Sequence, residues 1–301
     1  MASVQAHLVS VLMRTLYKPG WIGKLTGDSA PRDRGGGIMD STRWPNRGFT
    51  ISPVNAADVP CAWIEPVKPG ATPTILYLHG GGYTGGTLLY YRDMLGRLAR
   101  EHGLRALYVD YRLAPRHLFP AAVYDALAAY RWLLQSGVAP EHIVFAGDSA
   151  GGGLALAALL AARDAGLSLP SGAALLSPWT DLEGAGETLI SRKRVDPVLN
   201  SPGVRPTGRL YLGGADPRDP LASPLYADLR GLPPLFIHVG DAEILLDDSR
   251  RLAERARASG VDVTLRIWPG MFHVFPIFPS LLPEARKAGD EMAAFILERG
   301  G

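Results

Sequence analysis

One serine, held between two glycines, offers the most specific chemistry in this sequence. Residues 147–151 read Gly-Asp-Ser-Ala-Gly, between the β-like run 143–146 and a helix-like stretch rich in Ala and Leu. A strand that turns sharply into a helix strains the residue at its tip and leaves little room for a β-carbon two positions before and after it. This pattern predicts Ser149 as a nucleophile, with Gly147 and Gly151 at the close approach.

A run of three glycines could supply the second element of such a site. His79-Gly80-Gly81-Gly82-Tyr83 follows the apolar run 74–78, which has the character of a buried strand. Main-chain N–H groups left bare by glycines suit a developing anion, although such a run can also be a flexible turn. We expect Gly81 and Gly82, with the N–H of Ala150 at the start of a helix, to form an oxyanion hole. Tyr83, directly after the glycines, is assigned to substrate binding.

A histidine near the end of the chain is the predicted general base. His273 belongs to the turn Gly-Met-Phe-His that follows the last predicted strand, 263–267. A histidine at the end of a neighbouring strand is placed to face Ser149. A lone histidine in a chain with seven is usually structural, and His273 is the one that stands in a turn directly after the last strand.

Three carboxylates compete to orient this histidine. Asp241, Glu243 and Asp247 all follow the predicted strand 235–239. Asp247 falls within the first turns of the next helix, where an acidic residue also stabilises the helix dipole. Asp241 comes directly after the strand, which is early for the turn, but it stays a candidate. Glu243 is preferred, and Ser149, Glu243 and His273 then follow one another in the order nucleophile, acid, histidine.

The elements that must position these residues alternate between strands and helices. This alternation predicts an α/β fold with a doubly wound, mostly parallel sheet. Each candidate lies at the carboxyl end of a predicted strand, where ligands bind in such sheets. The expected strands are 49–51, 62–64, 74–78, 106–109, 143–146, 172–176, 235–239 and 263–267.

Two segments do not fit the alternation. Residues 177–234 separate consecutive strands, too long a connection to lack structure of its own. We expect an inserted cap segment at about 184–222, with a charged piece, an Asn-Ser-Pro-Gly break and a Pro-rich return, followed by a core helix near Leu210. Residues 1–47 begin with an amphipathic helix and are expected to form an N-terminal cap segment, which leaves 48–301 as the core.

Composition excludes several classes of protein. The 31 Lys and Arg residues are scattered and balance 29 Asp and Glu residues, so neither nucleic acid nor an anionic membrane surface is expected as a partner. The single cysteine, Cys61, allows neither an internal disulfide nor a cysteine-rich metal site. The longest uncharged apolar stretch, 149–162, is too short to span a bilayer. A cytoplasmic protein is expected, and its oligomeric state, a homodimer included, stays open.

Taken together, these residues resemble the hormone-sensitive lipase family of bacterial esterases (family IV), within the α/β-hydrolase fold. The resemblance implies an eight-stranded sheet, a helical cap and hydrolysis of small short-chain carboxylic esters, with no cofactor and no metal. It also places Glu243 at the family's acid position, although this chain reads Glu-Ile-Leu-Leu-Asp where the family often has Asp-Pro-Leu-Arg-Asp, and Arg116 replaces a usual acidic residue. The matching pieces are His79–Gly82, Asp110–Pro115, Phe119–Ala122, Gly147–Gly152, Ser177–Pro178 and Ser223–Leu225.

Two other functions are also compatible with the sequence. The same constellation would serve an amide or lactone hydrolase, because any acyl transfer needs the same groups. A non-catalytic ligand receptor on this fold is the other alternative, and the intact pair of Ser149 and His273 argues against it.

Overall fold

The computed structural model describes residues 2–16, 38, 46–68 and 73–301. Most of the predicted N-terminal cap segment, 1–47, lies outside these residues. The described chain forms an eight-stranded sheet in the order β1-β2-β4-β3-β5-β6-β7-β8, in which β1 and β2 are antiparallel to their neighbours and the other pairs are parallel. The predicted α/β fold with a mostly parallel sheet is therefore confirmed. The strands are Phe49–Ala56 (β1), Val59–Pro66 (β2), Thr74–Leu78 (β3), Arg105–Val109 (β4), Ile143–Asp148 (β5), Gly172–Leu176 (β6), Leu235–Gly240 (β7) and Val263–Trp268 (β8).

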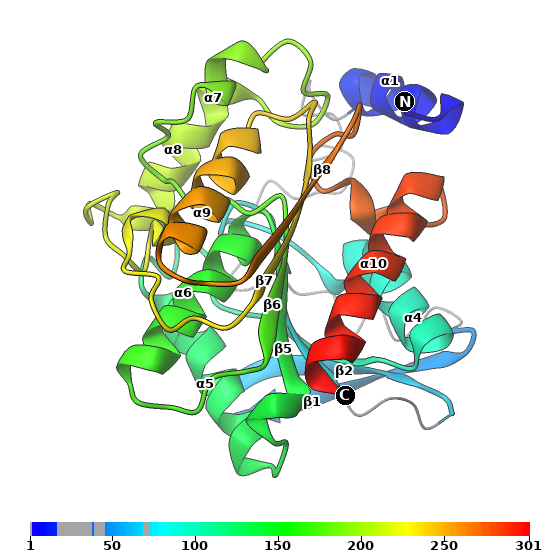
Figure 1. Cartoon of the computed structure of the whole chain (residues 1–301), viewed down its shortest axis with the longest axis vertical. Coiled ribbons are helices and arrows are strands. Elements are labelled where there is room, and N and C mark those ends of the chain that lie inside the picture. The colour runs from blue at the N-terminus through cyan, green and yellow to red at the C-terminus, as the bar shows by residue number, and fades with distance from the viewer. Residues whose placement is uncertain (1, 17–37, 39–45, 69–72) are drawn as a thin grey trace.

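Helices cover both faces of the sheet (Figure 1). One face packs against α4 (Leu88–His102) and α10 (Pro283–Gly300), and the other against α5 (Ala121–Gln135), α6 (Ala150–Asp164) and α9 (Leu246–Ala258). The central strands β3, β5, β6 and β7 are buried along their whole length, because helices exclude water from both of their faces. Short 3₁₀ turns connect these elements at Pro140–His142, Pro224–Tyr226 and Phe275–Ile277.

Three helices lie beyond the carboxyl ends of the strands, at the top of Figure 1. The first, α1 (Val4–Leu16), buries Ala6 and Val9 in a cluster with Met271 and Phe272, next to His273. The other two, α7 (Thr188–Ser191) and α8 (Ser201–Leu212), belong to the segment between β6 and β7. Arg14 of α1 donates a hydrogen bond of 3.0 Å to the carbonyl of Val195, which joins the two segments.

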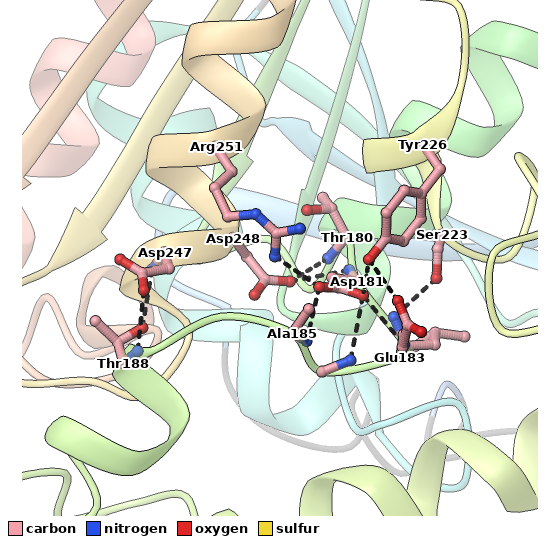
Figure 2. A network of polar contacts seen from close by, with 12 residues as sticks. Thr180, Asp181, Glu183, Ala185, Thr188, Ser223, Tyr226, Asp247, Asp248 and Arg251 are labelled. Carbon is pink, nitrogen blue, oxygen red and sulfur yellow. Dashed lines mark hydrogen bonds and ion pairs between the residues drawn. The ribbon is translucent and has the colours of Figure 1, made fainter.

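A buried polar network ties the start of the inserted segment to α9 (Figure 2). Asp181 accepts hydrogen bonds from Arg251 Nη1 at 2.6 Å and from the Tyr226 hydroxyl at 3.0 Å. Asp248 accepts from the backbone N–H groups of Thr180 and Asp181, at 2.8 and 3.0 Å. The chain therefore leaves β6 through a fixed loop before the inserted segment begins.

This network predicts a stability that depends on pH through Asp248. Burial and the neighbouring Asp181 charge raise the pKa of Asp248 to about 8, against the bonds from the two N–H groups. Between about pH 4, near the pKa of an unfolded aspartate, and pH 8 the folded chain holds a proton that the unfolded chain has lost, so stability falls as pH rises. Asp248→Asn should remove this loss, so its melting temperature relative to the wild type should be higher at pH 8 than at pH 5. An equal difference at both pH values would contradict the assignment, and Asp164→Asn, on an exposed carboxylate, is the control.

Candidate active site

Ser149 lies at the sharp turn between β5 and α6. Its backbone has φ 52° and ψ −122°, a left-handed conformation that a non-glycine residue rarely adopts. A β-carbon on Gly147 would collide with the carbonyl of Gly151, and one on Gly151 would collide with the carbonyl of Leu78 in β3. The two glycines therefore stand where the strand and the helix leave no room for a side chain.

A continuous hydrogen-bonded chain joins the three predicted catalytic residues. His273 Nε2 lies 2.9 Å from Ser149 Oγ, and His273 Nδ1 lies 2.7 Å from Glu243 Oε2. The three residues come from the carboxyl ends of β5, β7 and β8, and all of them are buried. Because Nδ1 faces a carboxylate, the neutral ring carries its proton there and leaves Nε2 as the acceptor for the serine hydroxyl.

The second oxygen of Glu243 is also fully engaged. Glu243 Oε1 accepts hydrogen bonds from Ser177 Oγ and from the N–H of Gly240, both at 2.7 Å. Ser177 Oγ in turn accepts from the N–H of Val274, directly after His273, at 3.1 Å. Ser177 thus joins the acid turn to the histidine turn. This role of Ser177 was not predicted from the sequence, although Ser177–Pro178 is among the pieces that match the family.

The other two acidic candidates lie elsewhere. Asp241 Oδ1 accepts from the N–H of Gly270 at 2.6 Å, in the turn that leads to His273. Asp247 Oδ2 accepts from the N–H of Thr188 at 2.9 Å, at the start of α7. Of the three carboxylates, the structure brings Glu243 to the histidine.

The glycine loop after β3 leaves two amides open. Gly81 is exposed and Gly82 is half-buried, and both have positive φ, at 116° and 63°. Neither their N–H groups nor that of buried Ala150 has an acceptor among the described residues. Such amides can donate to a negatively charged oxygen without breaking an existing bond.

Asp148 fastens this loop to the serine turn. Its carboxylate accepts from the N–H of Gly80 at 2.8 Å and from the hydroxyls of Tyr77 and Tyr91, at 2.9 and 3.3 Å. Burial raises the pKa of Asp148 to about 6, although these hydrogen bonds oppose the rise. His79 adds a further restraint, because its Nδ1 lies 2.7 Å from the carbonyl of Gly80 and its ring stacks on Tyr111 at 4.2 Å. This role of Asp148 was not predicted from the sequence.

The electrostatic field of the site acts on His273. Burial lowers the pKa of the imidazole, but the charges of Glu243, Asp196 and Asp148 outweigh it and raise the pKa above its ordinary value. Asp196 was also missed. It is buried in the inserted segment, and it accepts from the N–H of Ile244, next to Glu243, at 2.9 Å. The inserted segment therefore contributes a carboxylate to the surroundings of the histidine.

Tyr83 is buried beside the glycine loop. Only 1% of its surface is exposed, and its ring stacks on that of Tyr211 in α8, with centroids 3.8 Å apart.

Among the described residues no group of three His, Cys, Asp or Glu side chains could hold a metal ion. None of the helices in the described ranges is both long enough and apolar enough for a membrane crossing.

The sequence of this chain is similar to those of known hydrolases. The family described as the alpha/beta hydrolase fold matches residues 75–277. An acetyl-hydrolase of Streptomyces hygroscopicus is 46% identical over 234 residues, which cover 78% of each chain. An esterase of Acinetobacter venetianus is 37% identical and covers 83% of this chain and 82% of its own.

Solved structures of esterases are similar to this chain in both sequence and fold. A crystal structure of an esterase from the bacterial hormone-sensitive lipase family is 41% identical, with a TM-score of 0.88 over the whole of both chains. A hormone-sensitive lipase from a metagenome library is 37% identical, with a TM-score of 0.85 over 98% of both chains. The chain therefore belongs to the alpha/beta hydrolase fold and, within it, to the hormone-sensitive lipase family of esterases.

Proposed function

We propose that this carboxylesterase cleaves small esters of short-chain acids, with Ser149 as nucleophile, His273 as general base and acid, and Glu243 as the orienting carboxylate. The observation that carries the proposal is the hydrogen-bonded chain from Glu243 through His273 to Ser149 Oγ. Gly81, Gly82 and Ala150 are proposed as the oxyanion hole. The N-terminal segment and the inserted segment are proposed to form the cap.

The reaction follows from the order of these groups. Ser149 Oγ attacks the ester carbonyl carbon while its proton passes to His273 Nε2, and the carbonyl oxygen becomes an oxyanion that the three amides stabilise. The tetrahedral intermediate collapses, and His273 gives the proton to the departing alcohol, which leaves an acyl-enzyme. A water molecule then repeats the sequence and releases the acid. Glu243 stays ionised and stabilises the imidazolium that forms in both steps.

The preference for short acyl groups is supported by the enclosure of the nucleophile. Only 8% of the Ser149 surface and 4% of the His273 surface are exposed. Helix α8 lies directly against the glycine loop, because a β-carbon on Gly82 would come within 2.9 Å of Thr207 Cγ2. We expect a site closed in this way to favour a short acyl chain over a long one. The acetyl-hydrolase of Streptomyces hygroscopicus, a relative at 46% identity, is consistent with the same class.

A series of p-nitrophenyl esters tests the proposal. We expect kcat/KM to be highest for acyl chains of roughly two to eight carbons and to fall by about tenfold or more for palmitate. A higher rate on emulsified long-chain triglyceride than on the butyrate ester would contradict the preference. Butyranilide and a γ-lactone, assayed in parallel, test the amide and lactone alternatives. A higher kcat/KM on either of them than on the butyrate ester would contradict the proposal. Absence of any nitrophenol burst would favour the non-catalytic receptor.

A further inference from the structure

Helix α8 contacts the glycine loop at two positions one helical turn apart. The Tyr211 ring lies nearly parallel to that of Tyr83, with an interplanar angle of 5° and centroids 3.8 Å apart. One turn earlier, Thr207 presents its methyl group to Gly82. Residues four apart lie on the same face of a helix, so this face of α8 covers two consecutive residues of the loop.

The backbone of Tyr83 needs such support. Its φ is 62°, in the left-handed region that a large side chain disfavours. A residue keeps this conformation only where its surroundings hold it. The carbonyl of Tyr83 accepts a hydrogen bond from the N–H of Ala114 at 2.9 Å. Its ring contacts Tyr211 on one side and Trp179 on another, where the ring centroids are 6.2 Å apart. Tyr83 directly follows Gly82, so its conformation helps to set the direction of the preceding amides.

Helix α8 is itself fixed from two directions. Gly208 packs on Trp179, where a β-carbon would lie 3.4 Å from Cζ2, and the N–H of Trp179 donates to the carbonyl of Ser149 at 2.8 Å. The carbonyl of Tyr211 accepts from the N–H of Phe119 at 2.9 Å. Helix α8 therefore packs between the glycine loop on one side and Trp179, which is hydrogen-bonded to the serine turn, on the other.

We propose that Tyr211 is a positioning residue for the oxyanion hole: by stacking on Tyr83 it holds the loop so that the N–H groups of Gly81 and Gly82 face the carbonyl oxygen next to Ser149. Helix α8 of the inserted segment is then part of the catalytic scaffold as well as a cover. This inference rests on the proposed function, because it assigns Tyr211 to the same reaction.

The expected effect is on kcat. Loss of a whole oxyanion donor lowers kcat by about 10² to 10³, and displacement of a donor should cost less than its removal. We therefore expect Tyr211→Leu, which removes the stacked ring, to lower kcat by about tenfold to a hundredfold while KM stays within about threefold. A merely structural loss of packing would lower the amount of folded enzyme and would leave the kcat of the folded fraction unchanged.

The conservative variant makes the test specific. The Tyr211 hydroxyl is buried and has no hydrogen-bond partner among the described residues, so the ring and not the hydroxyl makes the contact. Tyr211→Phe keeps the ring and should restore kcat to within about threefold of the wild type. Leu210→Ala, on the exposed side of the same helix, is the matched control for changes in α8. Melting curves and active-site titration of all four proteins give the folded fraction.

A fluorophosphonate supplies a second readout that depends on no particular ester. Its reaction with Ser149 also develops negative charge on an oxygen in the hole, so the second-order rate should fall for Tyr211→Leu in parallel with kcat. If the wild type hydrolyses the butyrate ester but Tyr211→Leu is equally fast in both assays, this inference is wrong and the proposed function stands. If Tyr211→Phe is as slow as Tyr211→Leu, the stacked ring is not the cause. If the wild type neither hydrolyses esters nor reacts with the phosphonate, the proposed function fails and the inference fails with it.

Discussion

Ser149→Ala should abolish ester hydrolysis while the protein folds as before. The serine hydroxyl is the atom that forms the covalent intermediate, and loss of the corresponding nucleophile in a serine protease lowers kcat by a factor on the order of 10⁶. The side chain contributes little to packing, because the hydrogen bond from its Oγ goes to His273 Nε2 and the turn is built by the glycines around it. The melting temperature should therefore change little.

Initial rates on a p-nitrophenyl butyrate assay, with enzyme at micromolar concentration, check this result. Ser136→Ala, at the exposed end of α5, is the matched control and should keep the wild-type rate. Fluorophosphonate labelling followed by peptide mass analysis should modify Ser149 in the wild type and leave the variant unlabelled. If the purified Ser149→Ala protein kept more than a few per cent of the turnover, another nucleophile would have to be sought.

The buried strands were the easiest part of the fold to predict. The runs 74–78 and 172–176 were expected with the bounds that the structure gives to β3 and β6. Each is a continuous apolar stretch between turn residues, because helices cover both faces. Strands β1 and β2 are longer than predicted. Both are partly exposed and contain prolines, such as Pro53, which a sheet tolerates on the edge strand that β1 forms.

The inserted segment was harder to predict. The Asn-Ser-Pro-Gly stretch was expected to be a break, and in the structure it opens α8, with Pro202 in the first turn. Proline is compatible with that place, because the first turn has no intrahelical acceptor for its missing N–H. A helix was expected near Leu210, and α8 ends at Leu212, followed by Gly213 with φ 58°. Local sequence therefore indicated the end of this helix better than its beginning.

Some residues of the site were also easier to predict from the sequence than others. Ser149, Glu243 and His273 could be placed from the sequence because each follows a strand in a turn of recognisable composition. Ser177 and Asp196 could not, because their contacts join parts of the chain that are 66 and 48 residues apart. Such contacts depend on strand order and on the path of the inserted segment, and neither can be deduced from spacing alone.

Glu243→Gln should lower kcat by about 10⁴, the effect of the corresponding change in a serine protease, with little effect on folding. The amide can still accept from Ser177 and Gly240 through its oxygen, but its NH₂ group then faces His273 Nδ1. The ring must take the tautomer with its proton on Nε2, which cannot accept the proton of Ser149. Loss of the carboxylate charge should also lower the raised pKa of His273, since Glu243 is the strongest of the charges that oppose burial.

The pH profile therefore separates this residue from its rival, Asp241. Hydrolysis needs a neutral imidazole, so in the wild type kcat/KM should fall as pH drops through a His273 pKa that lies above 6.5. In Glu243→Gln the acidic limb of the residual activity should move to lower pH, because an imidazole with a lower pKa stays neutral down to a lower pH. Asp241→Asn should keep both the rate and the limb, because an asparagine oxygen can still accept from the N–H of Gly270. If Asp241→Asn lost the activity and Glu243→Gln kept it, Asp241 would be the acid in solution. A large loss in Glu243→Gln without a shift of the acidic limb would mean that the carboxylate orients the ring but does not set its pKa.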